Sequence, residues 1–321
     1  MAKALVETRG LKKYFDTPRG LLHAVDDVNL TINYGETLGV VGESGCGKST
    51  LGRVIIKLLD ATDGRVYFEG KDITDAKGDM RLRRDMQIIF QDPFSSFNPR
   101  MSISETIAEP LKIHHLCRSR DALNRRVTQL MDTVGLARRF ANSYPHELDG
   151  GRRQRIGIAR ALALEPKFIV CDEPVSALDV SIQAQILNLM QDLQAEKGFT
   201  YLFITHDLSV VKHISDEIMV MYLGVMVEKS RSDDLFDQPL HPYTKALLSA
   251  IPEPRINKTR RREVLQGEIT SPVNPQPGCR FAARCKYAKE ICTRQNPELQ
   301  EVCPGHMAAC HFVREINGLQ E

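Results

Sequence analysis

The sequence contains no long apolar run and carries almost no net charge. A membrane-spanning helix needs about 20 consecutive apolar residues, and no run approaches that length. The stretch from Met1 to Glu7 also lacks the apolar segment of a signal peptide. The 43 basic and 41 acidic side chains nearly cancel, which gives no general reason to expect a nucleic acid partner. We therefore expect a globular protein that remains in the cytosol.

Internal repeats and long low-complexity tracts are also missing. With 321 residues, of which 42% are apolar, the chain predicts a main domain with a sizeable core and a smaller second part. The composition changes after Ala250, which predicts a boundary between domains 1–250 and 251–321. Prolines follow at 252, 254, 272, 275 and 277, with a basic run at Arg255, Lys258, Arg260, Arg261 and Arg262.

Buried strands alternate with helices over much of the main domain. Short apolar runs predict strands at 37–41, 168–171 and 201–204, and helical spacing is found at 49–56 and 182–196. This alternation is typical of an α/β fold with a mostly parallel sheet. Helix signals dominate from about 92 to 150, which predicts an inserted helical subdomain.

A glycine-rich segment between a predicted strand and a predicted helix fits the phosphate-loop pattern G-x-x-x-x-G-K-[ST]. In such a loop the backbone N–H groups surround phosphates, the lysine reaches the β- and γ-phosphates, and the hydroxyl binds Mg²⁺. The alternative is a glycine-rich turn that arose by chance. The candidate nucleotide-binding residues are Gly42, Glu43, Ser44, Gly45, Cys46, Gly47, Lys48, Ser49 and Thr50.

Two carboxylates, Asp172 and Glu173, follow the strand at 168–171. Ligands bind at the carboxyl edge of open α/β sheets, which places this pair beside a bound nucleotide. We expect Asp172 to hold Mg²⁺ and Glu173 to orient the attacking water. Without the phosphate loop, the pair is read as a solvated strand end.

The order of these motifs resembles that of the ABC ATPases over roughly residues 3–250. Besides the phosphate loop, the matching segments are Phe90-Gln91-Asp92-Pro93, Gly150-Gly151, Asp172-Glu173-Pro174, Ser176-Ala177-Leu178-Asp179 and Ile204-Thr205-His206-Asp207. The resemblance implies a P-loop NTPase (RecA-like) fold, with an antiparallel β edge and the inserted helical subdomain.

The resemblance also implies roles for single residues. Gln91 would sense Mg²⁺ and the lytic water, His206 would contact the γ-phosphate, and Asp179 would lie at the seam of an ATPase dimer. Tyr14 would stack on adenine. The alternatives are that Tyr14 is a core aromatic and that His206 is satisfied by its neighbours.

The signature segment departs from the family pattern. Family members read Leu-Ser-Gly-Gly-Gln, whereas this chain has Leu148-Asp149-Gly150-Gly151-Arg152. Asp149 can still cap a helix, but it would bring a negative charge toward the γ-phosphate held by the opposite subunit. The repulsion between two like charges ~4 Å apart costs about 4 kcal/mol. One hypothesis is a heterodimer with one weakened ATP site. The other is that Asp149 turns outward or pairs with Arg152, and both sites work.

Five of the eight cysteines lie between 279 and 310. They form none of the tight pairs of a zinc knuckle, but so many thiols in a cytosolic protein indicate a metal. The segment His-Pro-Tyr-Thr at 241–244 and the later Asn-Pro-x-Pro-Gly-Cys resemble the C-terminal extension of peptide-importer ATPases, where four cysteines bind a 4Fe-4S cluster. That resemblance implies Cys279, Cys285, Cys292 and Cys310 as ligands and leaves Cys303 extra. Zinc and free thiols remain open.

These features predict the ATP-hydrolysing subunit of an ABC importer for dipeptides or oligopeptides. The implied partners are a homologous ATPase subunit, two membrane-spanning permease subunits and an extracellular substrate-binding protein, with this chain at the cytoplasmic face of the membrane. Nickel chelates and oligosaccharides remain open as substrates. Rival hypotheses are a soluble ABC ATPase of DNA repair or the ribosome, and a regulatory partner with an inactive site.

Overall fold

The computed structural model describes residues 3–76, 78–251 and 271–319. The chain divides into two compact units. The first comprises Met1–Leu5, Asn33–Glu36 and Asp75–Ile204, and the second comprises Val6–Ile32, Thr37–Thr74 and Thr205–Glu321. Pro252, Pro254 and the predicted basic run lie outside the described residues.

Three parallel strands form the sheet of the first unit. β7 (Phe168–Asp172) pairs on one side with β6 (Met86–Ile89) and on the other with β8 (Thr200–Ile204). Every residue of β7 and β8 is buried, as in a parallel sheet that is covered on both faces. The parallel arrangement predicted from the apolar runs is therefore confirmed.

Helices make up most of the remainder of the first unit, and α3 contacts both α4 and α5. The helix α3 begins with a capping box, in which the Ser102 side chain accepts from the Glu105 amide and the Glu105 carboxylate accepts from the Ser102 amide. The described residues between 92 and 150 contain helical turns and no strand. The α-helices described in the whole first unit are α2 (Met80–Asp85), α3 (Ile103–Ile113), α4 (Arg120–Thr133), α5 (Gly150–Leu162) and α6 (Val180–Lys197).

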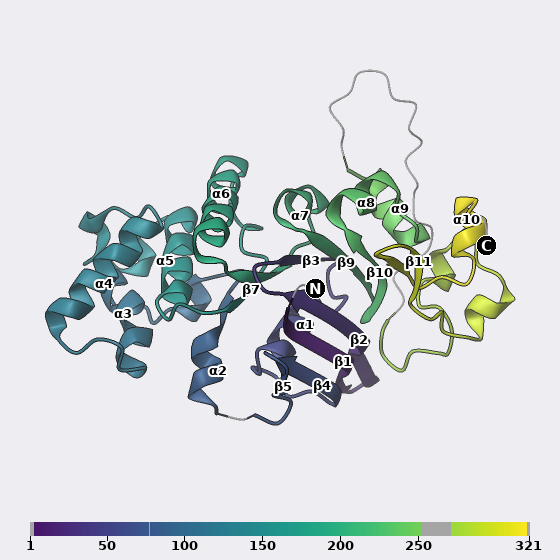
Figure 1. Ribbon diagram of the computed structural model, residues 1–321, viewed down its shortest axis with the longest axis horizontal. Coiled ribbons are helices and arrows are strands. Elements are labelled where there is room, and N and C mark those ends of the chain that lie inside the picture. Colours follow the sequence, from purple (N-terminus) through teal and green to yellow (C-terminus); the bar gives the residue numbers. More distant parts are fainter. Residues whose placement is uncertain (1–2, 77, 252–270, 320–321) are drawn as a thin grey trace, which may run out of the picture. The chain divides into compact units, whose positions relative to one another are not determined.

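An antiparallel sheet of four strands belongs to the second unit (Figure 1). Its order is β2 (Gly20–Asn33), β1 (Ala4–Thr17), β4 (Asp63–Phe68) and β5 (Lys71–Asp72). Buried and exposed positions alternate near the end of β2, as in a strand with one covered face.

The other strands of the second unit start from β3 (Thr37–Val41), which is buried at every position. It pairs in parallel with β9 (Glu217–Tyr222), and β9 pairs antiparallel with β10 (Val225–Arg231). The helix α7 contacts β3. The helices of this unit include α1 (Lys48–Ile55), α7 (Leu208–Ile214), α8 (Ser232–Asp237) and α9 (Pro242–Ser249).

The described residues 271–319 of the predicted C-terminal extension continue this sheet. β12 (His306–Ala308) pairs antiparallel with β10, and β11 (Gln300–Cys303) pairs with β12. The rest of its described secondary structure is the 3₁₀ helices at Ala282–Arg284 and Glu290–Thr293 and the helix α10 (Val313–Asn317). Backbone pairing therefore joins the extension to the rest of the second unit.

A buried carboxylate reinforces this junction. Glu228 of β10 has no exposed surface, and its oxygens accept from the Leu240 amide at 2.7 Å and the His241 amide at 2.9 Å. The Nε2 atom of His306 lies 2.7 Å from the Glu228 carboxylate. Because a buried carboxylate requires such partners, Glu228 fixes the position of the extension. Within the described ranges, no helix has the length and apolar character needed to span a membrane.

Candidate functional site

The phosphate loop runs from the end of β3 to the start of α1 and depends on glycine at both ends. Gly47, at the N-cap of α1, has a φ of 101°, and a Cβ atom there would lie 1.9 Å from the Ala24 carbonyl oxygen. A Cβ at Gly42 would lie 2.2 Å from the Met221 carbonyl oxygen. Any side chain at either position would therefore displace the loop.

Lys48 lies inside this loop, and only 4% of its surface is exposed. Its Nζ atom donates to the carbonyl oxygens of Gly42 at 2.8 Å and Glu43 at 3.0 Å. The ammonium group is thus held at the centre of the loop, where a phosphate would meet a positive charge. The neighbouring Cys46 thiol is buried, and burial raises its pKa.

Glu43 is fixed by two groups from later in the chain. Its amide donates to the Tyr243 hydroxyl at 2.9 Å. Its carboxylate accepts from both terminal nitrogens of Arg284, at 2.8 and 3.1 Å. The hydrogen bonds that Arg284 donates to Glu43 raise the pKa of Arg284 above its ordinary value, so the guanidinium stays charged.

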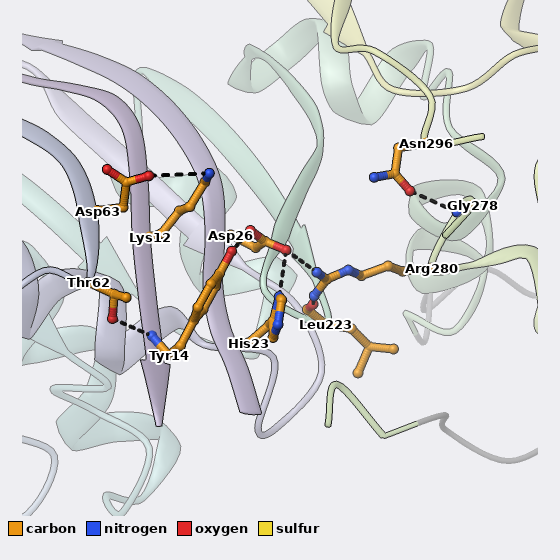
Figure 2. Close-up of polar contacts among 10 residues, drawn as sticks. All are labelled: Lys12, Tyr14, His23, Asp26, Thr62, Asp63, Leu223, Gly278, Arg280 and Asn296. Atoms are coloured by element: carbon orange, nitrogen blue, oxygen red, sulfur yellow. Dashed lines mark hydrogen bonds and ion pairs between the residues drawn. The ribbon is translucent and has the colours of Figure 1, made fainter. Parts of the chain in front are cut away.

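Tyr14 is half-buried on β1 and belongs to a polar network (Figure 2). Its ring stacks on that of His23, with ring centroids 3.9 Å apart, and its hydroxyl donates to Asp26. Arg280 donates to the same carboxylate and to the Leu223 carbonyl. Burial of the hydroxyl, followed by its bond to Asp26, raises the pKa of Tyr14. Tyr14 is thus only partly buried, with its ring against that of His23.

The predicted carboxylates of the first unit follow β7. Asp172 is 2% exposed at the strand end, and Glu173 comes next with a φ of 48°, a conformation that non-glycine residues rarely adopt. The Glu173 amide donates to the Ile204 carbonyl oxygen at 2.9 Å. Gln91 Nε2 donates to a Glu173 carboxylate oxygen at 3.0 Å and to Ser176 Oγ at 3.3 Å. The structure thus brings together Gln91 and Glu173.

Asp149 is the N-cap of α5, as its residue type predicted. One carboxylate oxygen accepts from the Arg152 amide at 2.8 Å, and the other lies 2.8 Å from the Arg152 guanidinium. A Cβ at Gly151 would approach the Ile182 side chain to 2.7 Å, so the helix start packs tightly on α6. Asp179 in turn caps α6, accepting from the Ile182 amide at 3.0 Å.

His206 belongs to the second unit. The preceding Thr205 donates its amide to the Val40 carbonyl oxygen at 3.1 Å, which anchors this segment beside β3. The His206 side chain is exposed. The predicted site residues therefore form two groups: the second unit contains Tyr14, the phosphate loop and His206, and the first unit contains Gln91, Asp149, Gly150, Gly151, Asp172, Glu173 and Asp179.

Two protein families match separate parts of the chain. Residues 25–176 match the family described as ABC transporter, and residues 227–292 match the oligopeptide/dipeptide transporter C-terminal region. The chain is 51% identical to the oligopeptide transport ATP-binding protein AppF of Bacillus subtilis, over 97% of this chain and 98% of that protein. It is 53% identical to OppF of Salmonella typhimurium, an oligopeptide transport ATP-binding protein, over 93% of each.

The chain belongs to the ABC transporter ATPases of the oligopeptide/dipeptide branch.

Solved ABC cassettes share the fold of this ATPase. The dimeric bacterial ABC transporter cassette MJ0796 is 30% identical and superimposes with a TM-score of 0.66, over 71% of this chain and 99% of that one. The same cassette in a post-hydrolysis state bound to ADP and phosphate is 31% identical, with a TM-score of 0.66 and the same coverage. The predicted P-loop NTPase fold is confirmed.

In the C-terminal extension of this ABC ATPase, four cysteines line one small pocket: Cys279, Cys285, Cys292 and Cys310. Cys303 does not contribute to it, and the remaining lining includes Phe281, Tyr287 and Phe312. Burial, together with the neighbouring cysteines, raises the pKa of Cys279 to about 11. Among the described residues, no three His, Cys, Asp or Glu side chains form a set that could hold a single metal ion.

The sequence reasoning missed Arg280, Arg284 and Glu228. Each arginine adjoins a predicted cluster ligand, Cys279 or Cys285, but nothing in the sequence indicates its partner. The same holds for Glu228, whose partners come from distant segments.

Proposed function

We propose that this ABC ATPase binds and hydrolyses Mg-ATP to energise the import of dipeptides and oligopeptides. The observation that carries the proposal is the union, in one chain, of an ABC transporter match with an oligopeptide/dipeptide C-terminal match. Relatives named for oligopeptide transport align with nearly the whole chain. Nickel chelates and oligosaccharides are the alternative substrates that the same experiments would detect.

Each site residue has a role in this proposal. Lys48 neutralises the β- and γ-phosphates within the loop, and Tyr14 supports the adenine ring. The Glu173 carboxylate, oriented by Gln91, positions the attacking water and accepts its proton. The exposed imidazole of His206 contacts the γ-phosphate. Ser49, Asp172 and Gln91 supply oxygen atoms of the kind that suit Mg²⁺, which neutralises the developing phosphate charge when bound.

The decisive experiment is ATP hydrolysis and labelled-peptide uptake by the transporter reconstituted in liposomes. Glu173→Gln should lower the hydrolysis rate by about 100-fold or more while Mg-ATP binding persists, because general-base catalysis typically contributes 10²–10⁴-fold. Asp132→Asn provides a matched control, since Asp132 pairs with Arg138 on the exposed surface of the first unit. ATP-dependent uptake of a nickel chelate or an oligosaccharide without peptide uptake would overturn the substrate assignment.

The partners follow from how an ABC transporter is assembled. We propose that the chain pairs with a homologous ATPase subunit, so that ATP lies between the phosphate loop of one subunit and the signature segment of the other. The ATPase pair would dock on two membrane-spanning permease subunits at the cytoplasmic face, through the helical segment at 92–150. An extracellular binding protein would deliver the peptide. Co-purification of these subunits from membranes tests the assembly.

The Asp149–Arg152 ion pair bears on the proposed heterodimer. Two working ATP sites require that the negative charge of Asp149 be neutralised where it would approach a phosphate. The Arg152 guanidinium, 2.8 Å from the Asp149 carboxylate, supplies the positive charge for this. We propose that Asp149, through this pair, remains compatible with ATP at the partner's phosphate loop.

We also propose that Cys279, Cys285, Cys292 and Cys310 hold a 4Fe-4S cluster. The donor set fits this group: four thiols surround one apolar pocket, and each iron of such a cluster takes one thiolate. In such a cluster the four thiolates bind four different iron atoms. Four thiols that could not all bind a single metal ion can therefore still be its ligands. When bound, the cluster would cross-link the extension covalently.

Iron and acid-labile sulfide content, measured on protein purified without oxygen, tests this assignment. About four irons and four sulfides per chain are expected, with the visible absorption of a cluster. Cys279→Ser should abolish both signals. The matched control is Cys303→Ser, which should leave them intact because Cys303 lies outside the pocket. Zinc in place of iron, or equal losses from both variants, would overturn the ligand assignment.

A further inference from the structure

Two arginines of the C-terminal extension bind residues of the nucleotide site. Arg284 pairs with Glu43 of the phosphate loop across 241 residues of sequence, and Arg280 pairs with Asp26 beside Tyr14 across 254 residues. All of these residues belong to the second unit. The extension therefore contacts both ends of the expected nucleotide position, the phosphates and the base.

Every polar group of Glu43 has a partner. The carbonyl accepts from Lys48, the amide donates to Tyr243 of α9, and the carboxylate accepts two bonds from Arg284. A parallel pair of bonds fixes the orientation of both planar groups, which a single bond would not do. The amide and carbonyl of Glu43 are backbone groups of the loop, so their bonds with Tyr243 and Lys48 fix the loop backbone at this residue.

The ion pair between Arg284 and Glu43 is largely withdrawn from water. The Arg284 side chain is 8% exposed and that of Glu43 is 25% exposed. Salt screens a pair in this setting less than one on the surface. Removal of either partner would leave the other charge partly buried and without its main counter-charge.

Arg280 acts at the other end of the site (Figure 2). It donates to the Leu223 carbonyl and to Asp26. Asp26 also accepts from the Tyr14 hydroxyl and lies 3.0 Å from the His23 ring nitrogen. The stacked rings of Tyr14 and His23 thus share one carboxylate, and Arg280 holds that carboxylate in place.

Phe281 fixes both arginines relative to the phosphate loop. It lies between them in the sequence and is 2% exposed. Its ring centroid is 5.3 Å from that of Tyr222 and 5.5 Å from that of Tyr243. Since Tyr243 also binds the Glu43 amide, this aromatic cluster and the arginines form one packed unit.

We propose that Arg284 and Arg280 are positioning residues for nucleotide binding. Arg284 holds the phosphate loop through Glu43, and Arg280 holds the Tyr14–His23 pair through Asp26. The inference rests on the proposed function, because it assigns the two arginines to that same ATP site. Its consequence is that the extension sets the affinity of the core for ATP.

Equilibrium binding of Mg-ATP to the full-length chain tests the proposal, with magnesium tripolyphosphate as a competitor that has no base. Arg284→Gln should weaken both ligands by about tenfold, because it acts on the phosphate loop. Arg280→Gln should weaken ATP by a similar factor and leave tripolyphosphate unchanged, because it acts on the base support. In hydrolysis assays KM for ATP should rise, while kcat changes by less than about twofold.

Three further variants separate positioning from general stability. Arg294→Gln removes an exposed ion pair with Glu290 within the extension and should leave ATP affinity unchanged. Arg284→Lys keeps the charge but not the paired bonds and should recover part of the affinity. The double variant Glu43→Gln/Arg284→Gln should weaken binding no further than either single variant, because the two changes remove the same interaction.

The outcomes are distinct. Arginine variants that melt at lower temperature but bind both ligands as tightly as the unsubstituted chain would overturn the inference and leave a structural role only. Equal effects of Arg280→Gln on ATP and tripolyphosphate would overturn the assignment of Arg280 to the base. Failure of the unsubstituted chain to bind Mg-ATP would instead overturn the proposed function.

Discussion

Gln91 Nε2 donates to a carboxylate oxygen of Glu173 at 3.0 Å, although 82 residues separate them in the sequence. The Glu173 backbone is held in a left-handed conformation, and its amide is bonded to the Ile204 carbonyl. Both the backbone and the side chain of Glu173 are thus oriented before any substrate arrives. Such preorganisation is what phosphoryl transfer requires of a protein.

Loss of the Gln91 amide should therefore lower kcat more than it weakens ATP binding. We expect Gln91→Ala to reduce the rate of phosphate release by about tenfold or more, because Glu173 loses the donor that orients it. Ser176→Ala is the comparison, since it removes the 3.3 Å contact of the same amide and the bond from Ser176 Oγ to the Glu173 carbonyl oxygen, but keeps the amide's bond to the Glu173 carboxylate. If both variants hydrolyse ATP at the unsubstituted rate, the bond to Glu173 has no catalytic role.

The Asp149–Arg152 pair predicts an order of effects in the assembled transporter. Arg152→Gln should lower the ATPase rate, because it exposes the Asp149 charge to the opposite γ-phosphate at a cost of up to about 4 kcal/mol. Asp149→Ser keeps an N-cap and should retain or raise the rate. The double variant should recover most of the loss. A double variant as slow as Arg152→Gln alone would show that the charge of Asp149 is not the cause.

The junction at Glu228 predicts a large change in stability. The two carboxylate oxygens of Glu228 now accept from the Leu240 and His241 amides and contact His306. Glu228→Gln would leave one acceptor oxygen and would place an NH₂ group, itself a donor, against one of these partners. The free energy of unfolding should fall by about 3 kcal/mol in urea titrations. Glu217→Gln on the neighbouring strand removes a partly exposed ion pair with Lys229 and should cost about 1 kcal/mol or less. Equal losses would contradict the role of Glu228.

The network at Asp26 predicts a pH dependence of stability. Burial raises the pKa of Asp26, but the hydrogen bonds from Tyr14 and His23 and the charge of Arg280 outweigh it, so the folded-state pKa lies below its ordinary value. The unfolded chain therefore binds the proton more readily. The stabilisation is complete above the unfolded pKa of about 3.9 and is lost as the pH falls through the lower folded value.

The comparison with Asp26→Asn isolates this contribution. The difference in unfolding free energy between the unsubstituted chain and Asp26→Asn should be constant from about pH 5 to 7 and should shrink below about pH 4. Urea titrations at several pH values would measure it. A difference that grows toward acid pH would show that the pKa of Asp26 is raised on folding.

Sequence patterns predicted the local parts of this fold well. The strand at 37–41, the glycines of the loop and the helix that starts at Lys48 follow from periodicity and steric needs within one short segment. The cap at Asp149 was also predictable from residue type. Its ion pair with Arg152 was foreseen as one of two alternatives, because the two residues are three positions apart on one helix.

Contacts between distant segments could not be predicted in this way. Glu43 occupies a position of the phosphate-loop pattern that accepts any residue, so nothing in the motif indicates a partner. In the sequence Arg284 is one of many charged residues expected at the surface. In the folded chain its side chain is only 8% exposed and lies beside the Glu43 carboxylate. Likewise, the stacking of Tyr14 on His23 depends on how β1 and β2 pair.

The three-sided hold on Glu43 limits how this ATPase can be recombined with its relatives. A chimera that takes its phosphate loop from another cassette, with a neutral residue at position 43, would satisfy the consensus yet leave the Arg284 guanidinium enclosed without its carboxylate. A chimera that exchanges only the C-terminal extension, for one without arginine at position 284, would leave the Glu43 carboxylate without its guanidinium. The loop and the extension should therefore be exchanged together, although 241 residues separate Glu43 from Arg284.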